Sequence, residues 1–214
     1  MLVIFDWDGT LCDSTDKIVS CMQEAAAALG LTVPEVEAVK NIIGLGLPEA
    51  IQSLYPALDA DGVEAMRQGY AHQYVVADVV PSQFFPGVEE TLEALLTGGH
   101  RIAVATGKSR AGLNRVMASL GVESLFHGSR CSDETASKPH PLMLQQLLQE
   151  FDTPVGDAVM VGDTEFDMEM ARRAGMARVA VDYGAHHVSR LLPYDPWACL
   201  SSMTGLLSLV EREG

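Results

Sequence analysis

Residues 2–11 read LVIFDWDGTL, and this stretch decides the fold. Residues 2–5 are all apolar, which is typical of a strand buried on both faces of a parallel sheet. Asp6 and Asp8 follow at once, and side chains two apart in an extended segment share a face. Gly9 then allows the chain to turn. Because open parallel sheets bind ligands at the carboxyl ends of their strands, we expect both carboxylates at a functional edge.

Three further apolar runs have the same character and are each followed by a polar or glycine-containing turn: Ile102 to Ala105, Ala158 to Val161 and Val179 to Val181. Amphipathic stretches lie between them, with apolar residues three or four positions apart. Strand and helix therefore alternate along the chain. This alternation predicts an α/β fold, a Rossmann-like parallel sheet with helices on both faces.

The interval 14–80 interrupts the alternation, since it has helical spacing and no convincing buried strand. It is too long for a simple crossover between two neighbouring strands. We therefore predict an inserted α-helical cap domain at 14–80 and a catalytic core made of 1–13 and 81–214. The hinges between the two are expected near 11–14 and 81–87.

Composition excludes several classes of protein. Of the 214 residues, 48% are hydrophobic and 20% charged, which excludes a disordered chain. The net charge of -15 disfavours nucleic acid and anionic membranes as partners. A small phosphorylated metabolite remains compatible, because a local lysine or a divalent cation can reverse the charge of one cleft. We expect a cytoplasmic protein, a monomer or weak homodimer, with four reduced and mostly buried cysteines that match no zinc spacing.

The second predicted strand ends at Thr106, and Gly107 and Lys108 then lead into a helix whose N-terminal N–H groups favour an anion. Gly107-Lys108-Ser109 also matches the end of a nucleotide P-loop. That motif requires a glycine five residues before Gly107, where this chain has Ile102 inside the strand. A P-loop is therefore excluded.

Two more motifs follow. Lys138 precedes an amphipathic helix, and by itself it favours a solvated surface charge over an anion ligand. Asp163 follows the strand at 158–161, and Asp167 comes four residues later, which places two carboxylates on one side of a helix. Asp163 alone is also compatible with a helix cap. Four like charges at one edge would repel unless a cation lay among them, and oxygen ligands without imidazole favour Mg²⁺.

In chain order, the strand ends carry Asp-x-Asp, Thr, Lys and Asp, and with this pattern the chain resembles the haloacid dehalogenase-like phosphatases over its whole length. Thr10, the position of the insertion and Pro86-Gly87-Val88 resemble the phosphoglycolate phosphatase branch. The resemblance implies that Asp6 is a nucleophile forming an aspartyl phosphate and that Asp8 is a general acid and base. It also implies a phosphorylated metabolite as substrate.

The same resemblance implies a role for each remaining motif residue. The phosphoryl group is expected to contact five residues: Gly9, Thr10, Thr106, Gly107 and Lys138. Mg²⁺ is expected to bind Asp6, Asp163 and the backbone carbonyl of Asp8, with Asp167 supporting the metal from nearby.

Two other functions stay open. A sugar phosphomutase similar to β-phosphoglucomutase would share every catalytic motif, and a bisphosphorylated sugar would distinguish it. A phosphate-sensing module without activity is disfavoured, because four acidic groups around one site cost stability. Specificity is expected to depend on the cap, through its loop at 44–48 and four basic candidates: Lys17, Lys40, Arg67 and the core residue Lys108.

Overall fold

The computed structural model describes residues 1–77 and 80–211. Its sheet has six parallel strands in the order β3-β2-β1-β4-β5-β6. The strands are β1 (Leu2–Phe5), β2 (Arg101–Thr106), β3 (Gly128–Cys131), β4 (Ala158–Gly162), β5 (Ala177–Val181) and β6 (Cys199–Leu200). β1 lies at the centre and pairs with β2 and β4. The predicted α/β fold with a parallel sheet is confirmed.

The four predicted strands correspond to β1, β2, β4 and β5 within one or two residues at each end. The edge strands β3 and β6 were not predicted. β3 reads GSRC and is only partly buried, and β6 is two residues long. Edge strands of this kind lack the continuous apolar run that identifies a strand buried on both faces.

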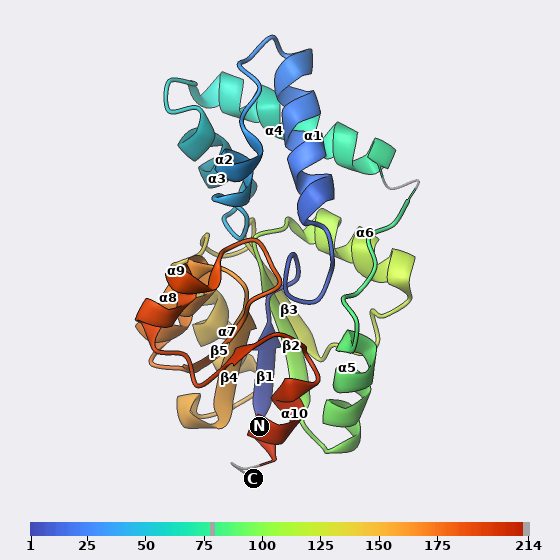
Figure 1. The fold of residues 1–214 in the computed structure, drawn as a ribbon, viewed down its shortest axis with the longest axis vertical. Helices are drawn as coiled ribbons and strands as arrows, with labels where there is room; N and C mark the ends of the chain where they lie inside the picture. The colour runs from blue at the N-terminus through green and yellow to red at the C-terminus, as the bar shows by residue number, and fades with distance from the viewer. Residues whose placement is uncertain (78–79, 212–214) are drawn as a thin grey trace.

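Helices cover both faces of the sheet (Figure 1). Val3 and Phe5 point to the face covered by α5 (Val88–Thr97), α6 (Arg110–Leu120) and α10 (Gly205–Val210). Leu2 and Ile4 point to the other face, covered by α7 (Leu142–Glu150) and α8 (Glu165–Ala174), with the short α9 (Val188–Leu191) packed beside α8. Successive residues of a strand alternate between faces, so the all-apolar β1 contributes to two separate cores.

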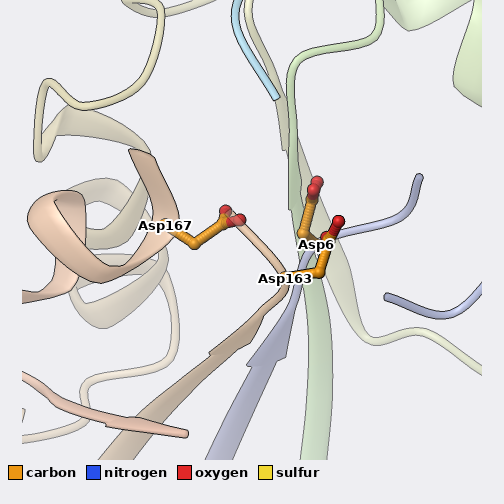
Figure 2. Close-up of side chains that lie close together, drawn as sticks. All are labelled: Asp6, Asp163 and Asp167. Atoms are coloured by element: carbon orange, nitrogen blue, oxygen red, sulfur yellow. The ribbon is translucent and has the colours of Figure 1, made fainter. Parts of the chain in front are cut away.

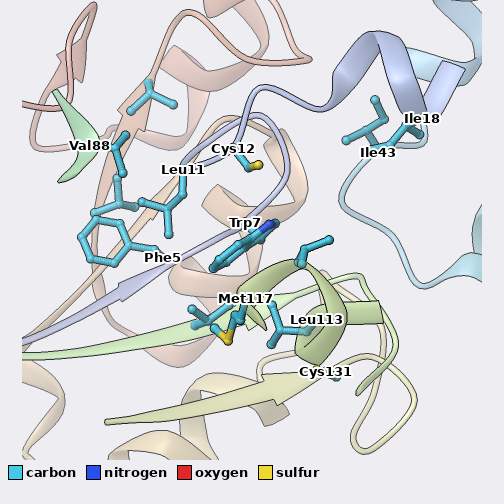
Figure 3. Close-up of a cluster of buried hydrophobic side chains, with 14 of the residues drawn as sticks. Phe5, Trp7, Leu11, Cys12, Ile18, Ile43, Val88, Leu113, Met117 and Cys131 are labelled. Carbon is cyan, nitrogen blue, oxygen red and sulfur yellow. The ribbon is translucent and has the colours of Figure 1, made fainter. Parts of the chain in front are cut away.

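Trp7 extends the apolar core beyond the end of β1. Its side chain is fully buried, and its ring centroid lies 5.8 Å from those of Phe84 and Phe126. Figure 3 shows Trp7 between the loop that carries Leu11 and the helix that carries Leu113. Because Trp7 stands between two aspartates in the sequence, its packing fixes the backbone from which both carboxylates project.

A helical layer lies beyond the carboxyl ends of the strands (Figure 1). It consists of α1 (Thr15–Ala28), α2 (Val36–Lys40), α3 (Leu47–Leu54) and α4 (Ala60–Ala77), with α1 packed on α2 and α4. Its division from the core as a separate cap domain stays a prediction, and residues 78 and 79, at the end of the predicted insertion, lie outside the described residues. Within the described part of the chain, no helix is long and apolar enough to cross a membrane.

The loop between α2 and α3 touches the core directly. The backbone N–H of Gly46 donates a hydrogen bond to Ser137 Oγ at 2.8 Å. A Cβ atom on Gly107 would lie 2.4 Å from the carbonyl oxygen of Leu45 and 2.7 Å from that of Gly44. Only glycine at position 107 allows the two backbones to approach this closely.

We expect Gly107→Ala to lower the free energy of unfolding by about 1–3 kcal/mol, because backbone atoms must move to admit the methyl group. Amide hydrogens at 44–46 should also exchange faster. Gly156→Ala is the matched control, because open space surrounds a Cβ atom at that position. Urea denaturation and hydrogen exchange measure both variants, and equal effects would contradict the close contact.

Candidate active site

Three aspartates meet at the carboxyl edge of the sheet. Asp6 follows β1, and its N–H donates to the carbonyl of Val161 at 3.0 Å, which extends the pairing with β4. Asp163 follows β4, the neighbouring strand. Figure 2 shows Asp6 and Asp163 side by side at these strand ends, with Asp167 turned toward them from α8. One carboxylate oxygen from each residue lies within 4.8 Å of the others, and all three residues are buried.

The approach of Asp167 has a different cause from the predicted one. Asp163 precedes the helix, so the two carboxylates are not related by one turn of α8. Thr164 is the N-cap, and Asp167 Oδ2 accepts hydrogen bonds from the Thr164 N–H at 3.1 Å and hydroxyl at 2.6 Å. This reciprocal capping box folds the Asp167 carboxylate back toward the strand end. The predicted proximity is therefore confirmed, while the predicted helical geometry is wrong.

Lys138 joins two of these carboxylates. Its Nζ atom lies 2.7 Å from Asp6 Oδ1 and 2.6 Å from Asp167 Oδ1, and its side chain is fully buried. Burial lowers the pKa of this lysine, but Asp167 and Asp6 outweigh burial and hold it above its usual range. Lys138 is thus a buried cation of the site, and the alternative of a solvated surface charge is wrong.

One ammonium group does not balance three buried carboxylates. Burial raises the pKa of Asp6 well above its usual range, and Asp167 and Asp163 raise it further, although Lys138 opposes them. Burial likewise raises the pKa of Asp163 to about 7, with Asp167 adding to the effect. Neither oxygen of Asp6 accepts a well-aligned hydrogen bond from the described residues. The donor set, made of oxygen atoms with excess negative charge, fits a hard divalent cation such as Mg²⁺.

Gly9 and Thr10 shape the surroundings of Asp163. The Thr10 hydroxyl donates to Asp163 Oδ1 at 2.7 Å, and the Ala185 N–H donates to Oδ2 at 2.7 Å. Gly9 has a φ of 79°, and a Cβ atom there would lie 2.2 Å from Asp163 Oδ2. The Thr10 hydroxyl is therefore engaged with Asp163. A phosphate contact through the backbone at these two residues stays a prediction.

The carboxylate of Asp8 lies apart from the other three. Its Oδ1 accepts a hydrogen bond from Ser14 Oγ at 2.5 Å and lies 3.0 Å from Lys108 Nζ. Lys108 also donates to the Tyr74 hydroxyl on α4 at 3.2 Å. Burial lowers the pKa of Lys108, but Asp8, Tyr74 and Tyr70 together outweigh burial and hold it well above its usual range. The metal contact expected through the backbone carbonyl of Asp8 stays a prediction.

Thr106 completes the predicted set. It is fully buried at the end of β2, and its Oγ1 accepts a hydrogen bond from the Lys108 N–H at 3.2 Å. Its hydroxyl hydrogen is therefore left to donate to another group. The next residue, Gly107, lines the same space as Asp6 and Asp8.

A cavity of about 350 Å³ lies between this edge and the helical layer. Of the four basic candidates for specificity, Arg67 and Lys108 line it. Lys17 donates to the carbonyl of Val80, Lys40 pairs with Glu37, and neither is among the described lining residues. Arg115 on α6 also lines the cavity and was not predicted, because no motif marks a basic residue within an amphipathic helix.

We expect Lys138→Met to lower the free energy of unfolding by about 3–5 kcal/mol without divalent ions, since it leaves buried carboxylates uncompensated. Lys40→Met removes an exposed i,i+3 pair and should change it by less than about 1 kcal/mol. Urea denaturation at pH 7 compares the two variants. A loss in Lys138→Met no larger than in the control would refute the buried cation.

Added Mg²⁺ should raise the thermal midpoint more at pH 8 than at pH 5. The raised pKa of Asp163 means that the folded protein holds an extra proton between pH 3.8 and about 7, so without metal this group's contribution to stability falls as pH rises through that range. Mg²⁺ must displace that proton at pH 5 but not at pH 8. Calorimetry with NaCl at equal ionic strength as the control measures the shift, and a larger shift at pH 5 would contradict this coupling.

Comparison with known proteins agrees with this geometry. The family model described as haloacid dehalogenase-like hydrolase matches residues 3–181. "Probable phosphatase IndB" of Dickeya dadantii is 35% identical over 199 residues, which cover 91% of this chain and 86% of that protein. A phosphoglycolate phosphatase of Vibrio parahaemolyticus is 29% identical over 224 residues, covering 98% and 95%.

Among solved structures, a haloacid dehalogenase-like hydrolase from Bacteroides fragilis superposes with a TM-score of 0.88 at 26% identity, covering 96% of this chain and 98% of that one. The match covers the helical layer as well as the sheet. The order of motifs, the parallel sheet and the family match agree, and the chain belongs to the haloacid dehalogenase-like hydrolases as an enzyme of that family.

Proposed function

We propose that this enzyme is a Mg²⁺-dependent phosphatase that hydrolyses a small phosphorylated metabolite through an aspartyl phosphate on Asp6. The observation that carries the proposal is the environment of the Asp6 carboxylate. It is buried at the floor of the cavity, lies beside Lys138, and has no well-aligned hydrogen bond from the described residues. The relatives named as phosphatases support the same reaction class.

Asp6, Asp163 and Asp167 are the residues that would hold the ion, as the fit of their oxygen donors indicates. When bound, Mg²⁺ neutralises the repulsion between a carboxylate nucleophile and an anionic phosphate. Lys138 supplies a second positive charge at the same edge. Thr10 and the Ala185 N–H keep the Asp163 carboxylate in one orientation.

The reaction would proceed in two displacements at phosphorus. In the first, an oxygen of Asp6 attacks, the bond to the leaving oxygen breaks, and Asp8 donates a proton to that oxygen. In the second, Asp8 removes a proton from water, which attacks phosphorus and releases phosphate and the free Asp6 carboxylate. Lys138 and the Thr106 hydroxyl would bind the phosphoryl oxygens, where charge develops.

The helical layer would act as a cap that closes the site during these steps. The contact of Gly107 with the 44–46 loop and the hydrogen bond that Lys108 donates to the Tyr74 hydroxyl support this role, because each joins the layer to a residue beside the carboxylates. A closed site selects the substrate and limits the entry of water. The bends would lie in the predicted hinges at 11–14 and 81–87.

Asp6→Asn and Asp8→Asn should differ in how they react with p-nitrophenyl phosphate. Because p-nitrophenolate leaves without a proton, Asp8→Asn should still be phosphorylated, whereas hydrolysis of the aspartyl phosphate should slow. The expected result is a burst of p-nitrophenol matched by one added phosphoryl group. Asp6→Asn should show neither. Rapid-quench kinetics with intact-protein mass spectrometry measures both quantities.

Hydrolysis of alkyl phosphates is the control for the same pair of variants, since an alkoxide needs a proton to leave. If Asp8→Asn shows no burst and hydrolyses alkyl phosphates at a near-normal rate, Asp8 is not the acid and base. The phosphomutase alternative shares these residues, and turnover that depends on added bisphosphorylated sugar would identify it.

A further inference from the structure

One side of the cavity is apolar and aromatic. We call this surface the apolar wall, and its members are Ile18 and Met22 of α1, Leu47 of α3, and Tyr70 and Tyr74 of α4. The Tyr70 and Tyr74 ring centroids lie 5.8 Å apart, with the rings tilted by 46°. Burial raises the pKa of both phenols, so both remain neutral at physiological pH. The apolar wall therefore presents hydrocarbon and uncharged aromatic surface, and it meets the core where the Lys108 ammonium lies 4.7 Å from the Tyr74 ring centroid.

The size of the cavity exceeds what a very small substrate fills. A volume of about 350 Å³ falls within the range of sites that enclose ligands of drug-like size. A phosphoryl group at Asp6 with a two-carbon leaving group would fill only part of that volume. The half-buried members of the apolar wall, Leu47 and Tyr70, would then stay in contact with water, at a cost that grows with their exposed area.

The charges around the cavity do not favour a second anion on the leaving group. Of the described lining residues, three are basic and four are acidic. Lys108 is already paired with Asp8, and Arg67 makes two hydrogen bonds at 2.7 Å to Glu64. A leaving group with a carboxylate, as in phosphoglycolate, would have to compete with these pairs for Lys108 and Arg67. The guanidinium of Arg115, the third basic residue, lies 5.8 Å from the centroid of the Tyr74 ring, on the apolar wall.

We propose that the substrate is a phosphate monoester whose leaving group carries an apolar ring, or a hydrocarbon body of similar size, that packs against the apolar wall. This inference rests on the proposed phosphatase function and names the substrate class of the same site. The phosphoryl group lies at Asp6, and the ring lies in the cavity against the side chains that α1 and α4 contribute to its lining. Burial of the ring against the apolar wall then selects the substrate, and a second ion pair contributes less.

Benzyl phosphate and ethyl phosphate test this inference, because both release a primary alkoxide and differ mainly in the ring. We expect kcat/KM for benzyl phosphate to exceed that for ethyl phosphate, and that for 2-phosphoglycolate, by about tenfold or more. Tyr70→Ala should reduce the benzyl-to-ethyl ratio toward one, and Tyr70→Phe should retain it. Tyr55→Ala is the matched control: Tyr55 is a cap tyrosine outside the described lining, and the ratio should persist.

Binding of phosphonates separates this inference from the proposed function, because the proposed mechanism does not break a carbon–phosphorus bond. Calorimetry with the wild-type protein and Mg²⁺ should show benzylphosphonate binding about tenfold more tightly than ethylphosphonate. If benzylphosphonate binds more tightly but no phosphate ester is hydrolysed, including p-nitrophenyl phosphate, the proposed phosphatase function is wrong. The binding preference of the apolar wall is then still supported. Hydrolysis with equal kcat/KM for the two esters, or equal binding of the two phosphonates, overturns the inference.

Discussion

The pairing of Lys138 with Asp6 and Asp167 is the interaction on which the rest of the site depends. Carboxylates buried at the ends of β1 and β4 repel one another, and the field of a single ammonium group reduces that repulsion without removing it. The remaining negative charge favours a divalent cation, and the cation in turn would allow an anionic phosphate to approach. Repulsion among the carboxylates therefore lowers the stability of the fold at this edge of the sheet. The two apolar cores on either side of β1 stabilise the sheet that carries the carboxylates.

The backbone fixes where each charge lies. Trp7 is packed between Phe84 and Phe126, so the residues on either side of it are held in place. The capping box of α8 directs Asp167, and Thr10 orients Asp163. Each carboxylate is thus held in place by local packing, by helix capping or by a hydrogen bond. This arrangement agrees with phosphoryl transfer, in which the protein contributes mainly the positioning of the reacting groups and the neutralisation of their charge.

The sequence predicts those features that depend on local pattern. β1, β2, β4 and β5 each contain a continuous apolar run, and Asp6, Thr106 and Asp163 follow from where such runs end. Lys138 follows no such run and is marked only by its place before an amphipathic helix. β3 and β6 escape prediction because edge strands need no apolar run. The partners of side chains depend on tertiary packing, so the engagement of Thr10 with Asp163 and of Lys108 with Asp8 could not be inferred. Arg115 lines the cavity because of how α6 faces the helical layer, which spacing within the helix does not reveal.

The central claim is that Asp6, among the aspartates gathered at this edge, receives the phosphoryl group. Acid quench during turnover, reduction of the acyl phosphate with borohydride and peptide mass mapping would locate the modified carboxyl group most directly. We expect a reduced side chain at position 6, formed only with substrate and Mg²⁺ present. Reduction at position 8, 163 or 167 would contradict the role of Asp6. So would turnover by the wild-type enzyme without any reducible intermediate, measured under the quench conditions that trap the intermediate in Asp8→Asn.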